Sequence, residues 1–539
     1  MTSPARSPDA DGTAPVRAAD IAAAMCLATD LGMGFPWGHG LAATLATMRL
    51  CDYADADAAT ARDAYYLSLL VYAGCTSDAI DTLETFGGPF GEEIADVIWG
   101  GTLEQMRVVV RNLPAPGASP VTAFATIARG LPRARSGLPE ERRGLCDVAR
   151  LMSQRLGTPE TVGDALHLLT ERWDGKSVLK RARGDQLPRA LRIALVARDA
   201  SYLAEVGGID HAVRLIAKRA GRAHDPEIAT IVMDHAQEIL GPLSNPPEIS
   251  DLWSQVLAAE KGERAMLKGE QVDDALGALG DFADLLTPSR TGHALAVSTL
   301  AERAATRMGL ATADVVRIRR AALVQDVGRA AIPAAVWERS GRFSAADWEQ
   351  VRLHPYYTER VCSASPFLRD LAPDAGCHHE RLDGSGYFRG ARGEALPASA
   401  RVLAAADALQ SLRERAPGRE PLTLADASEA LADEARDGRL DTDAVAAVIE
   451  AAGGDPPKLE RPAGLTDREA QVVTLLARGL ATKQLARALG VTPKTADHHI
   501  QNAYRKMGVS SRAGATVFAM EHGLINWGEL PMGGRTAST

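Results

Sequence analysis

Apolar residues recur along the chain with the spacing of helices. Val297, Leu300, Ala301 and Ala304 occupy positions i, i+3, i+4 and i+7, which lie on one face of a helix. Alanine is abundant throughout, whereas alternation of β-branched and polar residues, the pattern of half-buried strands, is scarce. The pattern therefore predicts a nearly all-α fold.

Two sets of short segments recur in the same order. One set recurs 254 residues later: Asp30-Leu31, Gly38-His39 and Gly74 match Asp284-Leu285, Gly292-His293 and Gly328. A second set recurs 209 residues later: the segments 171–175, 183–184 and 187–188 and Arg192 match 380–384, 392–393, 396–397 and Arg401. This order predicts two tandem copies of one helical domain, at 18–245 and 275–455.

The stretches between and around these copies differ in composition. Residues 1–17 are polar, lack the apolar stretch of a secretory signal and are expected to form a disordered tail. Segment 246–274 is charged and predicts a helical connector. Residues 456–464, within a stretch rich in Gly and Pro, predict a linker, followed by a small domain at 465–528 and a tail at 529–539.

Charge is distributed unevenly over the 539 residues. The formal net charge is −9, yet residues 465–525 hold eight Lys or Arg and four Asp or Glu. A basic module on an acidic body is typical of a regulator that contacts DNA at one end. No apolar run is long enough to cross a membrane, and six scattered cysteines suit a reducing compartment. We therefore expect a cytoplasmic protein without a membrane partner.

The second copy gathers residues that commonly bind metals. In chain order these are His293, the pair Gln325-Asp326, His354, the pair His378-His379, and Asp407. Imidazole and carboxylate groups suit first-row divalent metals, and two ions bridged by a carboxylate stabilise phosphodiester hydrolysis. A lone histidine is usually a core or surface residue, but this ordered series with helix-length gaps favours a metal site.

These residues belong to recognisable motifs. The segment HHERLDGSGYFRG at 378–390 resembles the signature of the HD-GYP phosphodiesterases, and QDVGR at 325–329 stands where that family has His-Asp-x-Gly-Lys. The resemblance implies hydrolysis of cyclic di-GMP with divalent metals such as Fe or Mn. The metal ligands that it implies are His293, Asp326, His354, His378, His379 and Asp407. It also implies that Asp326 and Arg329 are catalytic, with Arg329 at the position of a lysine that contacts phosphate.

Three positions depart from the family pattern. Gln325 replaces the histidine of the HD pair, Arg329 replaces lysine, and Phe388 replaces the proline of the GYP triplet. A glutamine carbonyl is a weaker ligand for transition metals than imidazole, so robust activity is not expected. The first copy departs further: His39 remains, but Val71-Tyr72 and Leu169-Thr170 stand at the two pairs. We expect that copy to bind no metal.

The C-terminal segment has clear helix boundaries. Thr466 and Glu469 form a predicted capping box, and Thr492-Pro493 gives an N-cap followed by proline at the first helical position. The third predicted helix places Ile500, Ala503, Tyr504 and Met507 on one face and polar residues on the other. A short turn between two such helices predicts a helix-turn-helix.

This segment resembles the LuxR-type helix-turn-helix over nearly its whole length. The resemblance implies contacts to double-stranded DNA from Lys483, Lys494, Thr495, His498, Gln501, Lys506 and Arg512, and a dimer formed through a fourth helix at about 512–522. His499 lies beside the apolar Ile500, so that it either contacts DNA or packs inward.

Two functions remain open at this point. One is a homodimeric transcription regulator whose HD-type body senses a ligand such as a cyclic dinucleotide, with weak or no catalysis. The other is an active metal-dependent cyclic di-GMP phosphodiesterase with a DNA-binding C-terminal domain. Gln325 and the degenerate first copy favour sensing, whereas His354, His378 and His379 favour catalysis.

Overall fold

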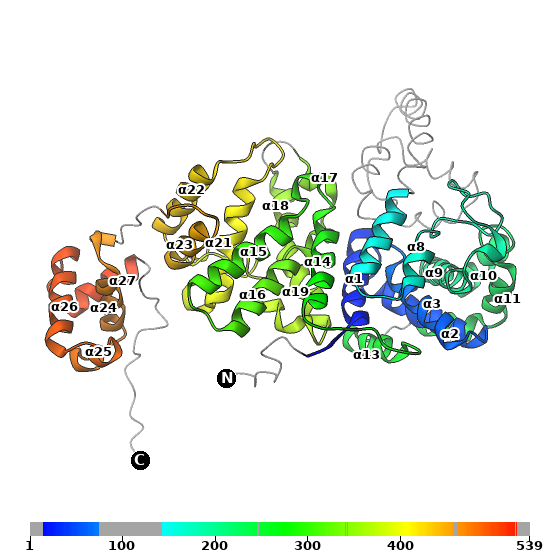
Figure 1. Ribbon diagram of the computed structural model, residues 1–539, viewed down its shortest axis with the longest axis horizontal. Coiled ribbons are helices and arrows are strands. Elements are labelled where there is room, and N and C mark those ends of the chain that lie inside the picture. Colours follow the sequence, from blue (N-terminus) through cyan, green and yellow to red (C-terminus); the bar gives the residue numbers. More distant parts are fainter. Residues whose placement is uncertain are drawn as a thin grey trace, which may run out of the picture. The chain divides into compact units, whose positions relative to one another are not determined.

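A computed structural model describes residues 14–74, 143–244, 247–339, 341, 343–456, 462–522 and 524. Helices make up most of this part of the chain (Figure 1), which confirms the all-α prediction. Its one two-stranded sheet pairs β1 (Val16–Arg17) antiparallel with β2 (Met266–Leu267). Residues 1–13 of the tail expected at 1–17 lie outside the described part. The last two residues of that tail form β1.

The first copy is built around one long helix. Its described helices are α1 (Ala18–Met33), α2 (His39–Tyr53), α3 (Ala58–Leu70), α8 (Glu160–Leu166), α9 (Arg189–Gly207), α10 (Ile209–Arg219), α11 (Pro226–Asp234) and α12 (Ala236–Leu240), with 3-10 turns η3 (Gly184–Gln186) and η4 (Gly241–Ser244). Helix α9 packs against α2, α3 and α10. The connector expected at 246–274 contains α13 (Ile249–Ala259) and also β2.

Helix α1 is apolar around most of its surface, with Asp20 and Asp30 as buried exceptions. Every residue from Ala18 to Asp30 is buried. A helix that is hydrophobic all round must be covered by neighbours. The neighbours include α2 and α3 of the first copy and, from the second, α14 (Glu270–Asp284), the 3-10 turn η6 (Val327–Ala331) and α19 (His354–Ala364). Helix α1 therefore joins the first copy to the segment that follows Asp326.

The second copy continues the helical series. Its remaining described elements are η5 (Pro288–Arg290), α15 (His293–Arg307), α16 (Thr312–Val324), α17 (Ala334–Trp337), α18 (Ala345–Val351), η7 (Leu368–Asp370), α20 (Ala372–Ala375), η8 (Gly393–Ala395), α21 (Ala398–Arg413), α22 (Leu424–Arg436) and α23 (Thr442–Ala451). Helix α19 packs on η6 and α20, and α21 packs on α22 and α23.

Corresponding turns form in both copies. In the first, the amide of Gly184 donates to the carbonyl of Trp173 (2.9 Å); in the second, Gly393 donates to Leu382 (3.0 Å). The ion pairs Arg192–Asp225 (2.6 Å) and Arg401–Asp441 (3.1 Å) also correspond. The repeat seen in the sequence thus has a local structural counterpart, while the exact limits of the two domains stay a prediction.

The C-terminal module consists of four helices. They are α24 (Asp467–Ala477), α25 (Thr482–Ala488), α26 (Pro493–Met507) and α27 (Arg512–Glu521), with η9 (Pro462–Gly464) before them. The capping box of Thr466 and Glu469 forms as predicted, and Thr492 caps α26 by accepting from the amide of Thr495 (3.2 Å). The predicted apolar face of α26 is buried, with Tyr504 partly so. Within the described ranges, none of the helices combines the length and apolar character needed to cross a bilayer.

Candidate metal centre and DNA-binding module

Asp326 lies between two of the predicted histidine ligands. It immediately precedes η6 and is buried, with 4% of its surface exposed. Its Oδ2 lies 3.6 Å from Nε2 of His293, and its Oδ1 lies 3.4 Å from Nε2 of His354. One carboxylate therefore faces two imidazoles through its two oxygens, as a bridging ligand would.

A backbone hydrogen bond fixes the orientation of His354. Its Nδ1 lies 2.6 Å from the carbonyl oxygen of Val351. Because a carbonyl can only accept, Nδ1 carries a proton, and in the neutral imidazole the lone pair is on Nε2, on the side of Asp326. Histidines that bind metals are commonly held in this way by a backbone carbonyl. The residue is thus prepared as a ligand.

His378, His379 and Asp407 provide a second set of donors. Nδ1 of His379 lies 3.6 Å from Oδ2 of Asp407, which belongs to α21. The two imidazole rings have centroids 4.2 Å apart, and the ring of Tyr387 lies 4.8 Å from that of His379. These contacts hold the adjacent histidines in defined positions.

Three of the predicted ligands come together as a group. His354, His378 and His379 offer nitrogen atoms that all lie within 4.8 Å of one another. Three imidazoles with a nearby carboxylate form a donor set that suits a divalent transition metal. The residues present therefore fit such an ion, and the identity of the metal stays open.

Arg329, at the position of the family lysine, is held by an aromatic ring. Its guanidinium lies 3.8 Å from the centre of the Trp337 ring, and its Nη2 donates to Oγ1 of Thr287 (3.3 Å). The Trp337 ring also lies 5.5 Å from the ring of His354. Stacking on a tryptophan restrains a planar guanidinium in a way that lysine cannot match. Sequence reasoning missed Trp337, since nothing in its local pattern distinguishes it from a core residue.

Gly328 permits the close packing that places His354. A Cβ at this position would lie inside van der Waals contact of two backbone atoms of α19, the carbonyl oxygen of His354 and the amide nitrogen of Thr358. Its own amide donates to Oγ1 of Thr358 (3.0 Å), which in turn donates to the carbonyl of Gln325 (2.7 Å). The segment that carries Gln325 and Asp326 is thereby fixed against α19.

Asp284 is a buried carboxylate near the centre that sequence reasoning did not assign to it. It accepts a hydrogen bond from the amide of Ala294 (3.0 Å), next to His293. Burial raises the pKa of its carboxyl to about 7, although the charges of His293 and Arg329 oppose the shift. Its place in the repeat was the available signal, because Asp30 accepts from the amide of Gly40 (3.0 Å) in the same way.

The first copy holds different chemistry at the corresponding positions. His39 is buried and pairs through Nδ1 with Glu205. Tyr72 stands where the second copy has Asp326, and Arg198, 209 residues before Asp407, lies 4.8 Å from the Tyr72 ring centre. These residues offer one imidazole and one carboxylate beside a guanidinium and a phenol, which is a poorer set for a divalent cation than that of the second copy.

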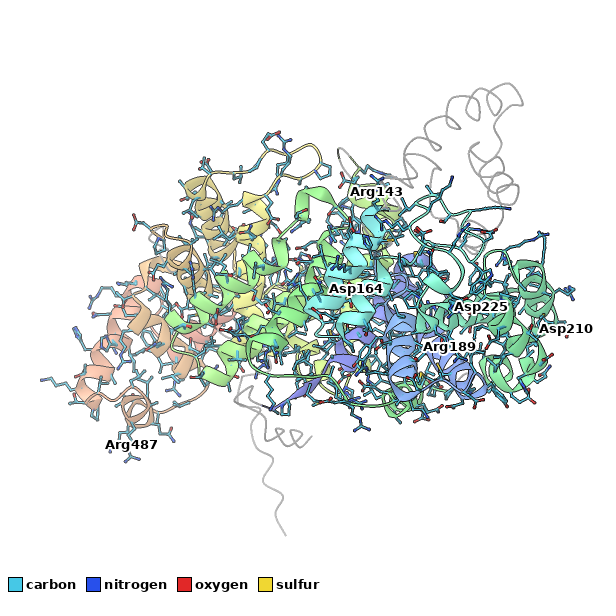
Figure 2. All side chains as sticks on the ribbon, turned by 45° about the vertical axis from the view of Figure 1, so that its right-hand side comes forward. Arg143, Asp164, Arg189, Asp210, Asp225 and Arg487 are labelled. Carbon is cyan, nitrogen blue, oxygen red and sulfur yellow. The ribbon has the colours of Figure 1, made fainter. Side chains whose placement is uncertain are left out.

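Most of the predicted DNA-contacting residues are exposed. Lys494, Thr495, His498 and Gln501 are exposed on α26, and Lys483 is exposed on α25. Arg487, labelled in Figure 2, extends from α25 into solvent and adds a positive charge that sequence reasoning did not assign. His499 is half-buried. The exposed face of α26 is polar, as a recognition helix requires.

Two predicted phosphate contacts are engaged within the module. Lys506 donates to Oε2 of Glu469 (2.6 Å) and to the carbonyl of Gly464 (2.8 Å). Arg512 donates to the carbonyl of Leu480. Their contact with DNA stays a prediction, but each also holds parts of the module together.

Comparison with known proteins identifies two families. Residues 278–444 match the family described as HD domain, and residues 463–519 match the luxR family of bacterial regulatory proteins. A Vibrio cholerae protein named 3′3′-cGAMP-specific phosphodiesterase 3 is 30% identical over 316 residues, which cover 57% of this chain and 65% of that protein. The chain therefore spans slightly less than two thirds of this relative.

Further similarities cover shorter parts or the fold. A Thermotoga maritima cyclic di-GMP phosphodiesterase is 32% identical over 29% of this chain and 42% of its own length. The regulatory protein MctR of Rhizobium johnstonii is 36% identical over 62 residues, which cover 12% of this chain and 29% of MctR. A crystal structure of a V. cholerae cyclic GMP-AMP phosphodiesterase has a TM-score of 0.56 at 22% identity, over 82% of this chain and 98% of that one, which shows a shared fold. The chain thus joins an HD domain, related to HD-GYP-type cyclic dinucleotide phosphodiesterases, to a C-terminal domain of the luxR regulatory family.

Proposed function

We propose that the protein is a cytoplasmic, homodimeric transcription regulator whose HD domain binds a cyclic dinucleotide and changes how its LuxR-type domain engages DNA. The observation that carries this proposal is the group of His354, His378 and His379 in a chain that ends in a LuxR-type domain. A divalent ion held there would supply positive charge for a phosphodiester oxygen.

The residues of the chain favour binding of a phosphodiester. Arg329 lies three residues after Asp326, and its guanidinium is restrained by Trp337. It adds a second positive charge to that of the ion. A guanidinium forms paired hydrogen bonds with phosphate oxygens. The names of the relatives specify cyclic GMP-AMP and cyclic di-GMP, so these two compounds are the ligands that we propose to test.

Weak turnover is expected because the donor set is uneven. His354, His378 and His379 supply three imidazoles, whereas Gln325 leaves the His293 side with one imidazole fewer than the family pattern. Losing even an indirect metal partner typically costs about 10–100-fold in affinity or activity, and a direct ligand at least as much. Binding without efficient hydrolysis is therefore our proposal.

The three-histidine group also supports a second candidate, an active metal-dependent phosphodiesterase. The orientation of His354 and the position of Asp326 beside His293 and His354 support it, since a metal-dependent hydrolysis would need both. In this case Asp326 would orient a nucleophilic water and Arg329 would hold the phosphate.

One set of measurements separates the two candidates. Metal content of the purified protein is determined first, and hydrolysis of cyclic di-GMP and 3′3′-cGAMP is then assayed with wild type and His378→Ala. In parallel, binding to duplex DNA is measured with and without each nucleotide. Nucleotide-dependent DNA affinity without hydrolysis supports the regulator. Hydrolysis abolished by His378→Ala would establish the enzyme, and DNA affinity indifferent to both nucleotides would refute the regulator.

A further inference from the structure

Arg290 lies directly against His293. Its Nη1 is 2.9 Å from Nδ1 and 3.0 Å from Nε2 of that imidazole. Arg290 ends the 3-10 turn η5, just before α15 begins at His293, so the short loop between them sets the contact. His293 itself is fully buried. A permanent cation therefore lies beside both ring nitrogens of a candidate metal ligand.

This guanidinium is close enough to exclude a second metal ion. Since Nη1 is almost equally far from both ring nitrogens, it lies against the face or the Cε1 edge of the ring. An ion bound about 2.0–2.1 Å from either nitrogen would therefore have this positive charge roughly 4 Å away. Two positive charges this close repel each other strongly inside a buried site. Nε2 of His293 lies 3.6 Å from Asp326. The guanidinium therefore lies on the side of the centre that has one imidazole fewer, because glutamine stands at position 325 in place of the family histidine.

The first copy offers an independent parallel. Arg198 is almost fully buried there and donates to the carbonyl of Gly40, 3.1 Å away, in the helix that His39 begins. It stands at the position that corresponds to Asp407, beside Tyr72 at the position of Asp326. In that copy a buried arginine thus lies where the second copy has carboxylates that would hold cations.

We propose that Arg290 takes the place of a second metal ion on the His293 side of the centre. It restricts the centre to one ion, held by His354, His378 and His379, and its guanidinium holds an oxygen of the bound phosphodiester that a second ion would otherwise hold. This inference rests on the proposed function, because it assumes that the three histidines bind a metal. It explains why Gln325 is compatible with a binding site: the ligand lost at that position served an ion that Arg290 replaces.

The test counts metal ions rather than turnover. Full-length protein is loaded with Mn²⁺, excess ion is removed, and manganese per chain is measured by elemental analysis together with the electron paramagnetic resonance spectrum. The variants are Arg290→Ala, Gln325→His, the double variant, and Arg290→Lys combined with Gln325→His. Arg303→Ala combined with Gln325→His is the matched control, since Arg303 lies exposed on the same helix as His293. Arg290→Gln serves as a second neutral variant if Arg290→Ala does not fold.

We expect about one manganese per chain in the wild type, in each single variant, in the lysine combination and in the Arg303 control. The double variant Arg290→Ala/Gln325→His should bind about two, with a spin-coupled spectrum. Arg290→Ala alone should weaken cyclic di-GMP binding about tenfold, as expected for one lost charged hydrogen bond.

Three results would overturn the inference. Two ions in Gln325→His with Arg290 intact would show that the guanidinium excludes nothing. One ion in the double variant would show that Arg290 does not limit occupancy, while the metal centre itself would stand. No manganese in any variant, including wild type, would overturn the centre and the proposed function together.

Discussion

The ammonium of Lys506 lies 2.6 Å from Oε2 of Glu469, a residue 37 positions earlier in the chain. Lys506 belongs to the last turn of α26, and Glu469 completes the capping box that starts α24. The pair therefore connects the end of the candidate recognition helix to the beginning of the first helix. A lysine that the sequence assigns to DNA phosphate also has a role in holding the module together.

The first prediction follows from this pair. Replacing Lys506 with Met keeps the aliphatic stem but removes the charge, and we expect the module to lose about 1 kcal/mol of stability, the upper end for a partly exposed ion pair. Hydrogen exchange of the amides in 464–472, followed by mass spectrometry on the full chain, measures the loss locally. Arg505→Met is the matched control, since Arg505 is exposed one position earlier. Equal effects of both substitutions would contradict the prediction.

The second prediction concerns pH. Burial raises the pKa of the Glu469 carboxyl, but hydrogen bonds from Lys506 and Thr466 outweigh burial and bring the pKa below its usual value of 4.5. A carboxyl with a lowered pKa in the folded state contributes stability that is present above its unfolded pKa and is lost as pH falls through the folded pKa. Exchange protection in 464–472, corrected for intrinsic rates, should therefore fall as pH drops below 4.5. In Glu469→Gln this pH dependence should flatten; an unchanged profile would exclude Glu469 as the cause.

The third prediction concerns contact with DNA. Lys494 lies exposed in the first turn of α26, at the end of the helix that meets DNA in helix-turn-helix proteins. If it contacts one phosphate, Lys494→Ala should weaken binding to all duplexes and reduce the slope of log K against log salt by about 0.9. Binding is measured by fluorescence anisotropy at several salt concentrations. Lys268→Ala, an exposed lysine far along the chain from the module, should leave the slope unchanged; a loss confined to one DNA sequence would instead identify Lys494 as a base contact.

Much of the C-terminal module could be predicted from the sequence because its signals are local. The capping residues Thr466 and Thr492 act on amides three positions away, and the buried face of α26 follows from helical spacing alone. The same holds for the all-α fold and for the repeated turns around Gly184 and Gly393. Local chemistry of this kind can be read from a single chain.

The contacts that the sequence did not reveal join residues that are distant or ambiguous. Trp337 restrains Arg329 across eight positions, through a ring that could equally have packed in a core. Lys506 had two plausible partners, DNA phosphate and a carboxylate, and only the fold brings Glu469 within reach. Arg290 precedes His293 by three residues, yet only the geometry of the loop between them turns its guanidinium onto the imidazole. Each of these depends on tertiary packing, which propensity and spacing do not encode.

The last prediction tests whether Gly328 positions the metal ligands. A Cβ there would collide with the backbone of α19 at His354 and Thr358, and backbone atoms cannot turn aside as a flexible side chain can. Helix α19 begins at His354, so relief of the collision must move that imidazole away from Asp326. We therefore expect Gly328→Ala to cost about 1–3 kcal/mol of stability, as overpacking does, and to weaken metal binding about tenfold or more.

Thermal unfolding and Mn²⁺ titration of the full chain measure both effects of Gly328→Ala. Gly163→Ala is the control, because a Cβ on this glycine of α8 would meet its neighbours at 3.7 Å or more, and alanine is the better helix former. Gly163→Ala should leave metal affinity unchanged and stability equal or slightly higher. If Gly328→Ala bound metal as tightly as the wild type while losing stability, the close approach of η6 to α19 would matter for folding but not for the geometry of the ligands. His354 would then be held in place by its other contacts, among them the hydrogen bond with Val351 and the ring of Trp337.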